Sequence, residues 1–567
     1  MMFYSTTSRV IGKLSPYFWI TAVLCIALGP ITNAQRTVGL LSYTPSKSFE
    51  GYNLLYPHNQ ADVFLLNNCG EIVHRWEDEP DFRPGNMAYI QENGDLIKCK
   101  RSAFVADDPI WAGGGGDIVE IRDWDNQLKW SFALNDSLSR LHHDIAPMPD
   151  GHILMIVWER KTREEAIQAG RDTSQVTEGE LWPDYIIEVD PETDQIVWEW
   201  HAWDHLIQDF DETKDNFGNV ADHPELIDIN WQTNDGGADW MHSNAIDYQA
   251  ENKLILLSVP TFHEVWVIDK STTTEEAAGH IGGFGKRGGD LLYRWGNPAA
   301  YRAGTETDQQ LFYQHDAHWV DDFLTNMHPQ FGKIAVFNNR VAADVSTVNT
   351  FEAGFDMYNW GFPFSNGTYE PAGFDYTYTH PTPSLIHSTG LSSVQFLPNG
   401  NALICAGRWG YSLEVTPDNE IVWEYKTPLR GGAPVTQGDS LAINNNLTFR
   451  LKRYPTNFEA FDNRDLSPNG YIELNPDTSF CQALMTNINE VERYDLSIAP
   501  NPAHDRLAIS WERGYRVALT IYDALGRVMT TVKGSGGRTY VDTSTWQEGL
   551  YFVRINDMDI RSLVILR

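Results

Sequence analysis

Positive charge is scarce in this sequence: 42 Lys and Arg stand against 77 Asp and Glu in 567 residues, a formal net charge of −35. No run of Lys and Arg offers a footprint for a phosphate backbone, so we expect no nucleic acid partner. After residue 34, no stretch reaches the roughly 18 apolar residues of a membrane span. The acidic composition indicates a surface suited to solubility outside the cell, and an anionic substrate would need a local exception to this field.

Cysteine is also rare, and no C-x-x-C spacing occurs among the 5 residues, so a zinc or thioredoxin-like motif is not supported. Cys25 falls in the N-terminal segment considered next, which leaves Cys69, Cys99, Cys405 and Cys481. Disulfides are permitted outside the cytoplasm, and four cysteines allow three full pairings, which stay open. Cys405 stands in an apolar run and is equally expected as a buried free thiol.

Residues 1–34 have the pattern of a signal peptide. Arg9 and Lys13 form a basic region, residues 17–28 are mostly apolar, and Ala34 offers a small residue for cleavage. The apolar part is too short for a comfortable membrane span. We therefore expect an exported mature chain.

An internal repeat dominates the next 450 or so residues, and it predicts the fold. An alternating strand, a turn with Asn-Gly or Asp-Gly and a second apolar strand recur as NMAYIQENGDLIKCK, HDIAPMPDGHILMIV and SSVQFLPNGNALICA. A second unit, an apolar strand, an acidic turn and a strand ending in an aromatic residue, follows as IIEVDPETDQIVWEW and SLEVTPDNEIVWEY. Two successive hairpins make a four-stranded blade. The repeats predict an all-β, six-bladed β-propeller over residues 35–485, with a pair of β-sandwiches as the alternative.

The texture changes after Cys481, and residues 494–567 predict a small C-terminal β-sandwich of short alternating strands. Its motifs are an early Pro-Asn-Pro at 500–502, then IYDALGRV, GLYFVRI and the terminal RSLVILR. This stretch resembles the C-terminal sorting domain of proteins exported by the type IX secretion system of the Bacteroidetes. The resemblance implies that the secretion machinery is a partner and that the protein is secreted or held at the cell surface.

Three predicted hairpins begin with a polar triplet at the head of the first strand. The triplets are His142-His143-Asp144, His242-Ser243-Asn244 and Gln314-His315-Asp316. In a propeller the innermost strands line the central channel, so equivalent positions converge there. Side chains alternate along a strand, which leaves open whether His142 or His143 faces the channel.

Converging histidines and an amide suit two kinds of chemistry. Imidazole and carboxylate groups are metal ligands. A neutral imidazole is also a nucleophile, and imidazolium and amide donors hold an oxyanion. Sulfuryl transfer resembles phosphoryl transfer in requiring neutralisation of three equatorial oxygens.

Residues 36–480 resemble the arylsulfotransferase family, through the segments LHHDIAPMPDGHIL, DWMHSNAIDY, STTTEEAAGHIGG, LLYRWGNPAAYRAGT, QLFYQHDAHW and FLPNGNALICAGRWG. The family consists of six-bladed propellers in which a histidine is transiently sulfurylated. The resemblance implies that His315 is the nucleophile, that His242 and Asn244 bind sulfate, and that His142 or His143 is the remaining catalytic histidine. It further implies a phenolic sulfate donor, a phenol acceptor, and neither a cofactor nor a metal.

One position departs from the family pattern. Better-known members carry an arginine on the strand after the H-x-N motif, where this sequence has Pro260, which supplies neither charge nor a hydrogen bond. His263, Arg294 and Arg302 are the candidates to replace it. Two rival functions remain: a propeller lyase or hydrolase of polysaccharides with a His-bound metal, and a surface binding protein without catalysis.

Overall fold

The computed structural model describes residues 36–231, 237–487, 497–511, 517–524, 526–534, 537–555 and 559–566. The predicted signal peptide, 1–34, lies outside these residues, as does the start of the predicted C-terminal domain, 494–496. Strands dominate the described chain and confirm the all-β class. None of the described helices is long and apolar enough to cross a membrane.

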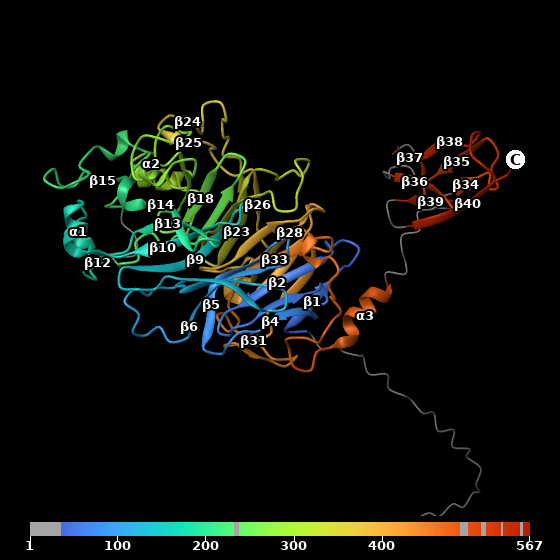
Figure 1. The fold of residues 1–567 in the computed structure, drawn as a ribbon, viewed down its shortest axis with the longest axis horizontal. Helices are drawn as coiled ribbons and strands as arrows, with labels where there is room; N and C mark the ends of the chain where they lie inside the picture. Colours follow the sequence, from blue (N-terminus) through green and yellow to red (C-terminus); the bar gives the residue numbers. More distant parts are fainter. Residues whose placement is uncertain are drawn as a thin grey trace, which may run out of the picture.

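Six antiparallel sheets of four or five strands follow one another along the chain (Figure 1). In hydrogen-bonding order, sheet 1 is β33 (Thr448–Pro455), β2 (Gly51–Pro57), β3 (Val63–Leu66) and β4 (Ile72–Trp76); sheet 2 is β5 (Phe82–Ile90), β6 (Leu96–Ser102), β7 (Ile118–Arg122) and β8 (Leu128–Ala133); sheet 3 is β9 (Ser139–Pro147), β10 (Ile153–Glu159), β13 (Asp184–Asp190) and β14 (Gln195–His201). Sheet 4 is β17 (Ala245–Gln249), β18 (Leu254–Val259), β19 (Glu264–Asp269) and β20 (Tyr293–Trp295); sheet 5 is β21 (His315–Trp319), β22 (Ile334–Ala342), β23 (Val345–Phe351) and β26 (Tyr376–Tyr378); sheet 6 is β27 (Ser393–Phe396), β28 (Ala402–Ala406), β29 (Tyr411–Val415), β30 (Ile421–Lys426) and β1 (Gly39–Tyr43).

Shorter elements fill the connections. Four two-stranded pairs are β11 (Lys161–Thr162) with β12 (Glu180–Leu181), β15 (Leu206–Ile207) with β16 (Ile227–Asp228), β24 (Phe364–Ser365) with β25 (Thr368–Tyr369), and β31 (Leu429–Arg430) with β32 (Ala433–Pro434). The α-helices are α1 (Arg163–Gln168), α2 (Thr274–Ala277) and α3 (Thr478–Asn487).

The first strands of the six sheets contact one another in a closed order: β33, β5, β9, β17, β21, β27 and again β33. The two ends of this region complete each other's sheets. The late strand β33 pairs with β2, and the early strand β1 pairs with β30. Neighbouring segments at the start and end of the region therefore depend on each other for their hydrogen bonds.

Apolar side chains explain why the sheets pack in this order. Six clusters of buried residues each combine side chains from two successive sheets, including sheets 6 and 1. Strand β10 shows the period of two: Ile153 and Met155 face sheet 2, whereas Leu154 and Ile156 face sheet 4. A strand that is buried on both faces is a continuous apolar run, as the sequence is here.

The three predicted hairpin turns are confirmed between β5 and β6, β9 and β10, and β27 and β28. In each turn the glycine alone of the dipeptide has a positive φ, at +87° for Gly94, +91° for Gly151 and +92° for Gly400. The turns are therefore closed by a single left-handed residue, which a side chain would strain.

The cysteines form one disulfide, between Cys69 and Cys481, with a Cα–Cα distance of 5.7 Å. It ties α3 to the loop before β4. Cys99 and Cys405 are buried free thiols, so the expectation for Cys405 as a free thiol is confirmed.

The C-terminal region has two further sheets. One contains β34 (Ser497–Ala499), β35 (Arg506–Ser510) and β38 (Arg538–Asp542); the other contains β37 (Val528–Gly534), β36 (Val517–Asp523), β39 (Gly549–Ile555) and β40 (Asp559–Ile565). Both sheets contribute to one apolar cluster that includes Leu507, Ile509, Leu519, Val553 and Leu563. This shared core makes the region a folding unit with its own interior.

A buried arginine links the first strands. Arg450 on β33 lies 2.8 Å from the carboxylate of Asp144 on β9 and 2.8 Å from that of Asp316 on β21. It also donates to the hydroxyl of Tyr89 on β5 and to the carbonyl oxygen of Asn244, just before β17. The other oxygen of Asp316 accepts the backbone N–H of Val394 on β27, so one cluster reaches all six first strands.

We expect Arg450→Met to lower the free energy of unfolding by about 3–5 kcal/mol, because it leaves two buried carboxylates without a partner. The shift in urea midpoint, followed by tryptophan fluorescence, measures this loss. Arg430→Met on the exposed end of β31 is the matched control, with an expected change within about 0.5 kcal/mol. Equal midpoints for the two variants would contradict the role of Arg450.

Candidate active site

The heads of the first strands depart from regular alternation. In the β9–β10 ladder, Leu141 pairs with Val157 and Ile145 with Met155, so three residues of β9 lie opposite one residue of β10. His143 and His242 have left-handed φ values of +53° and +56°, which are uncommon outside glycine. Such a bulge redirects side chains and is typical of functional sites. It removes the alternation on which the sequence argument about His142 and His143 depended.

His143 lies against His242, with ring centroids 4.5 Å apart. His142 lies behind it: the two Nδ1 atoms are 2.9 Å apart, and the His142 ring stacks on Trp158 at 4.0 Å. The Nε2 of His142 is 3.3 Å from the carboxylate of Asp184. The structure therefore brings His143 into the histidine cluster, with His142 between it and a carboxylate.

Gly114 is needed beside His143. Its φ is +91°, and a Cβ there would lie 2.1 Å from the His143 ring. Its carbonyl oxygen accepts the backbone N–H of His143 at 2.8 Å. Only glycine permits this approach, so the imidazole is held in place by backbone.

The tautomer of His315 follows from its neighbour Asn339. The Nδ2 of Asn339 donates to the carbonyl oxygens of Ser388 at 2.7 Å and Leu391 at 3.0 Å, so its Oδ1 faces His315. The Nδ1 of His315 lies 2.9 Å from that oxygen and must donate to it. The lone pair of the imidazole is then on Nε2, the atom that can act as a nucleophile.

Burial and charge separate the histidines into two kinds. Burial and the neighbouring His242 lower the pKa of His315 to about 3, and burial with the same neighbour holds the pKa of His143 well below its usual value. Burial also opposes the charged form of His242, but Asp239 accepts its Nδ1–H at 2.5 Å and raises the pKa. The site thus combines two neutral imidazoles with one that favours the cation.

Two arginines complete the site, and the sequence argument missed both. The Arg340 guanidinium lies 3.5 Å from the centroid of Tyr313, whose ring is 6.1 Å from those of both His242 and His315. A Cβ on Gly390 would be 3.4 Å from Arg408 Nη2 and 3.8 Å from His315 Cε1, so these two side chains approach the same point. Within the described ranges neither arginine has a carboxylate partner.

Unpaired cations beside a charged imidazole make an anion site, because nothing else neutralises them. Burial, and next the charge of Arg340, lower the pKa of Arg408, which is what two close guanidinium groups without a counter-ion produce. The sequence did contain a signal for one of them, since Arg408 lies in the family segment FLPNGNALICAGRWG.

The three candidates to replace the arginine missing at Pro260 occupy other roles. Arg294 is fully buried in an ion pair with Glu264, and Arg302 lies 2.8 Å from the carboxylate of Asp228. His263 borders the site, but its Nδ1 accepts the backbone N–H of Tyr313 at 3.0 Å. Burial lowers the pKa of His263 to about 4, so it is neutral.

Asn244 supports the backbone of the neighbouring strand. Its Nδ2 donates to the carbonyl oxygen of Gln314 at 2.8 Å, and the Gln314 amide in turn donates to the carbonyl oxygen of Glu264 at 2.7 Å. This chain of bonds fixes the residue that precedes His315. Contact of Asn244 with sulfate stays a prediction.

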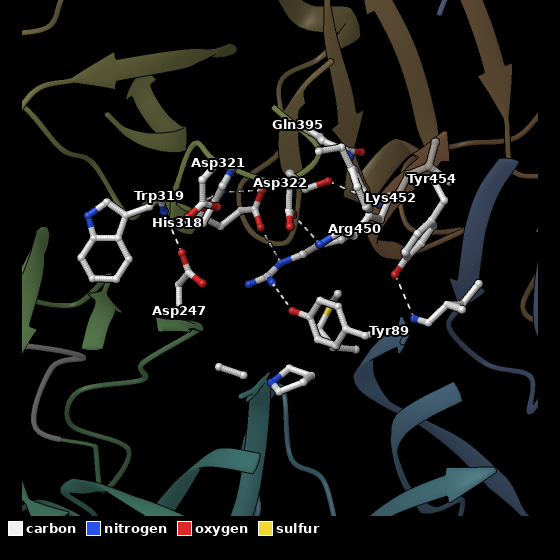
Figure 2. A pocket seen from close by; sticks show the side chains of 18 of the residues that line it. Tyr89, Asp247, His318, Trp319, Asp321, Asp322, Gln395, Arg450, Lys452 and Tyr454 are labelled. Atoms are coloured by element: carbon white, nitrogen blue, oxygen red, sulfur yellow. Dashed lines mark hydrogen bonds and ion pairs between the residues drawn. The ribbon is translucent and has the colours of Figure 1, made fainter. Parts of the chain in front are cut away.

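Figure 2 shows a cavity of about 340 Å³ at the other side of Arg450. All six first strands line it, with Asp247, His318, Asp322 and Lys452 among its polar side chains. Among the described residues that line it, none is a histidine of the cluster. Phe449, whose ring is 6.3 Å from His143 and 6.4 Å from His315, lies next to Arg450 in the chain and closes the floor of the histidine site.

Comparison with protein families gives two matches. Residues 116–355 match the arylsulfotransferase family, and residues 497–565 match the secretion system C-terminal sorting domain. The second match indicates export across the outer membrane, to the cell surface or the medium. A search of curated proteins finds no match.

Solved structures give distant similarities. They include a protein of unknown function from Bacteroides caccae, with 10% identity, TM-score 0.36, and 72% of this chain and 99% of that chain covered. A virginiamycin B lyase from Staphylococcus aureus has 9% identity, TM-score 0.29 and coverage of 66% and 84%. A putative 6-phosphogluconolactonase from Bacteroides fragilis has 13% identity, TM-score 0.29 and coverage of 75% and 99%. At these scores the similarities support no argument about this chain.

The Asn339 contact predicts how His315 reacts with diethyl pyrocarbonate, which modifies unprotonated imidazole nitrogen. Because the pKa of His315 is lowered to about 3, its modification rate is expected to stay constant from pH 8 to pH 5. Asn339→Ala frees Nδ1 and lets the proton move to Nε2, which lowers the rate roughly 3- to 10-fold. Peptide mapping by mass spectrometry measures both effects.

The control is Asn399→Ala, an exposed asparagine in the β27–β28 turn, which is expected to react like the unchanged protein. A rate that falls with a midpoint near 6.5 in the unchanged protein would show that His315 is an ordinary exposed histidine.

Proposed function

We propose that this chain, which carries an arylsulfotransferase domain over residues 116–355 and a type IX sorting domain over 497–565, is an exported aryl-sulfate sulfotransferase. It moves a sulfuryl group from a phenolic sulfate ester to a phenol. The observation that carries the proposal is the neutral His315, with its lone pair on Nε2, beside His242, Arg340 and Arg408. A nucleophile within a cluster of unpaired cations suits attack on an anionic ester.

The same proposal includes the domain plan. Residues 35–485 form a six-bladed β-propeller in which each of the six sheets is a blade, and residues 494–567 form a β-sandwich. The cyclic contacts of the first strands and the six apolar clusters between successive sheets support the first assignment. The apolar cluster shared by the two C-terminal sheets supports the second.

In the first half-reaction, Nε2 of His315 attacks the sulfur of the donor. The N–S bond forms as the S–O bond to the phenol breaks, and the oxygen leaves with the electron pair of that bond. The imidazolium of His242 and the guanidinium groups of Arg340 and Arg408 neutralise the three sulfuryl oxygens. They replace the arginine absent at Pro260.

The second half-reaction reverses these bonds with a new phenol. His143 takes the phenol proton while the oxygen attacks sulfur, and the N–S bond breaks to restore neutral His315. The protonated His143 then supplies that proton to the next leaving phenolate. Its low proton affinity makes it a strong acid once charged, and His142 and Asp184 behind it disperse the charge.

The first test mixes the mature protein with p-nitrophenyl sulfate and phenol. We expect phenol-dependent release of p-nitrophenolate and, without phenol, an adduct of about 80 Da on the peptide that contains His315. His315→Ala should lose both, whereas His328→Ala, a half-buried histidine outside the site, should keep both.

Transfer that survives His315→Ala would refute the assignment of the nucleophile. If the unchanged protein gives neither release nor adduct, the binding protein without catalysis becomes the better explanation. Activity that disappears with a chelator and returns with metal would instead favour the metal-dependent lyase or hydrolase.

Arg408→Met tests the replacement of the missing arginine. Loss of one charge-assisted contact to the sulfuryl group is expected to lower kcat/KM for p-nitrophenyl sulfate roughly 10- to 100-fold. Steady-state rates across donor concentrations measure the change, with Arg430→Met as the matched control. Unchanged kcat/KM in Arg408→Met would remove this arginine from the sulfate site.

A further inference from the structure

A second group of histidines lies far along the sheets from the first strands. His205 follows β14, the last strand of sheet 3, and Asp290 precedes β20, the last strand of sheet 4. The Nδ1 atoms of His205 and His280 approach the same carboxylate oxygen of Asp290, at 2.8 Å and 2.7 Å. Three potential metal ligands, one atom each, therefore lie within 4.8 Å of one another.

The surroundings of His205 leave its Nδ1 directed at this point. Its Nε2 lies 2.8 Å from the carbonyl oxygen of Ala277, at the end of α2, and must donate to it. A neutral imidazole has a single N–H, so its Nδ1 then presents a lone pair toward the oxygen of Asp290. Two lone pairs 2.8 Å apart need a cation between them, either a proton or a metal ion. Metal-binding histidines characteristically donate their other N–H to a carbonyl or carboxylate oxygen, as here.

Rigid packing holds this arrangement in place. His205 is fully buried and its ring is parallel to that of Trp200, 5.7 Å away. Trp200 donates its indole N–H to the carbonyl oxygen of Gly289 at 2.7 Å. A Cβ on Gly289 would be 2.0 Å from Ala277 O and 2.6 Å from His205 Nε2, so glycine is required there. The buried ligand is thus preorganised before any ion binds.

The other side of the group is open. The side chain of His280 is 59% exposed, against 8% for Asp290, so water has access and His280 has room to move. A tetrahedral zinc ion bonds to nitrogen and oxygen at about 2.0–2.2 Å. Its ligands are then about 3.3 Å apart, which requires a small outward shift of the exposed imidazole.

We propose that His205 Nδ1, His280 Nδ1 and Asp290 Oδ1 form a zinc site, with water as the fourth ligand. Two imidazoles and one carboxylate suit zinc, whereas calcium prefers oxygen ligands alone. The ion replaces the protons between these atoms. It fastens the segment from α2 to β20 onto the end of sheet 3 and stabilises an exported protein, apart from the histidines on the first strands.

A second cluster with similar atoms differs in its charge. Asp150, His152 and Glu188 also lie close together, but the ammonium group of Lys270 is 2.6 Å from Glu188 and supplies the positive charge there. This contrast supports the choice of the first group, in which no Lys or Arg contacts Asp290 within the described ranges.

The test uses the mature full chain without a histidine tag, stripped with a chelator and titrated with ZnCl₂ by calorimetry. We expect one zinc ion per chain and a higher melting temperature with zinc. His280→Ala keeps the buried His205 and Asp290 in place, so it should fold, and it is expected to weaken zinc binding roughly 10- to 100-fold or more. Its melting temperature should no longer respond to zinc.

Asp290→Asn should lose the site in the same way, whereas His328→Ala serves as the matched control and should bind zinc like the unchanged chain. Stoichiometric binding that survives both site variants would overturn the assignment of the ligands. Absence of stoichiometric binding in the unchanged chain would overturn the site itself. Neither measurement depends on sulfuryl transfer, so the zinc site and the proposed activity are tested separately.

Discussion

Arg450 lies buried between the carboxylates of Asp144 and Asp316, and the centre of the molecule depends on this charge balance. A buried carboxylate without a partner costs several kcal/mol, so neither aspartate is stable in the interior without the guanidinium. Arg450 is carried by β33, near the end of the six-sheet region, whereas Asp144 lies on β9. The balance is therefore complete only when the last of the six first strands has joined the others.

The same contact explains why the histidines face elsewhere. Asp144 follows His143, and Asp316 follows His315, so each aspartate held at Arg450 fixes the histidine before it. In a regular strand these neighbours would simply alternate, but His143 and Asp316 both have left-handed backbone. Strain of this kind costs of order 1–3 kcal/mol at each position and persists where surrounding contacts fix it. Here those contacts include the ion pairs of Arg450 and the close approach of Gly114.

Local patterns in the sequence predicted the hairpins and the polar triplets, because turn chemistry and strand period act over a few residues. They could not distinguish His142 from His143, since the choice depends on a bulge that the alternation rule does not contain. Arg340 and Arg450 carried no signal, because an arginine in a strand is normally exposed and its partners here come from distant sheets. Asn339 was missed for the same reason: its importance lies in the two carbonyl oxygens that orient it, Ser388 and Leu391.

The proposed sulfate site differs from the rest of the molecule in its carboxylates more than in its arginines. Arg294, Arg302 and Arg450 are also buried or half-buried, but each lies against Asp or Glu and offers no net charge to a ligand. Arg340 and Arg408 have carbonyl and amide oxygens as partners instead, which orient them without neutralising them. In a chain of net charge −35, positive potential arises only where carboxylates are kept away. Asp239 is consistent with this argument, because its proton-sharing contact with His242 keeps that imidazole cationic on the side that faces the ligand.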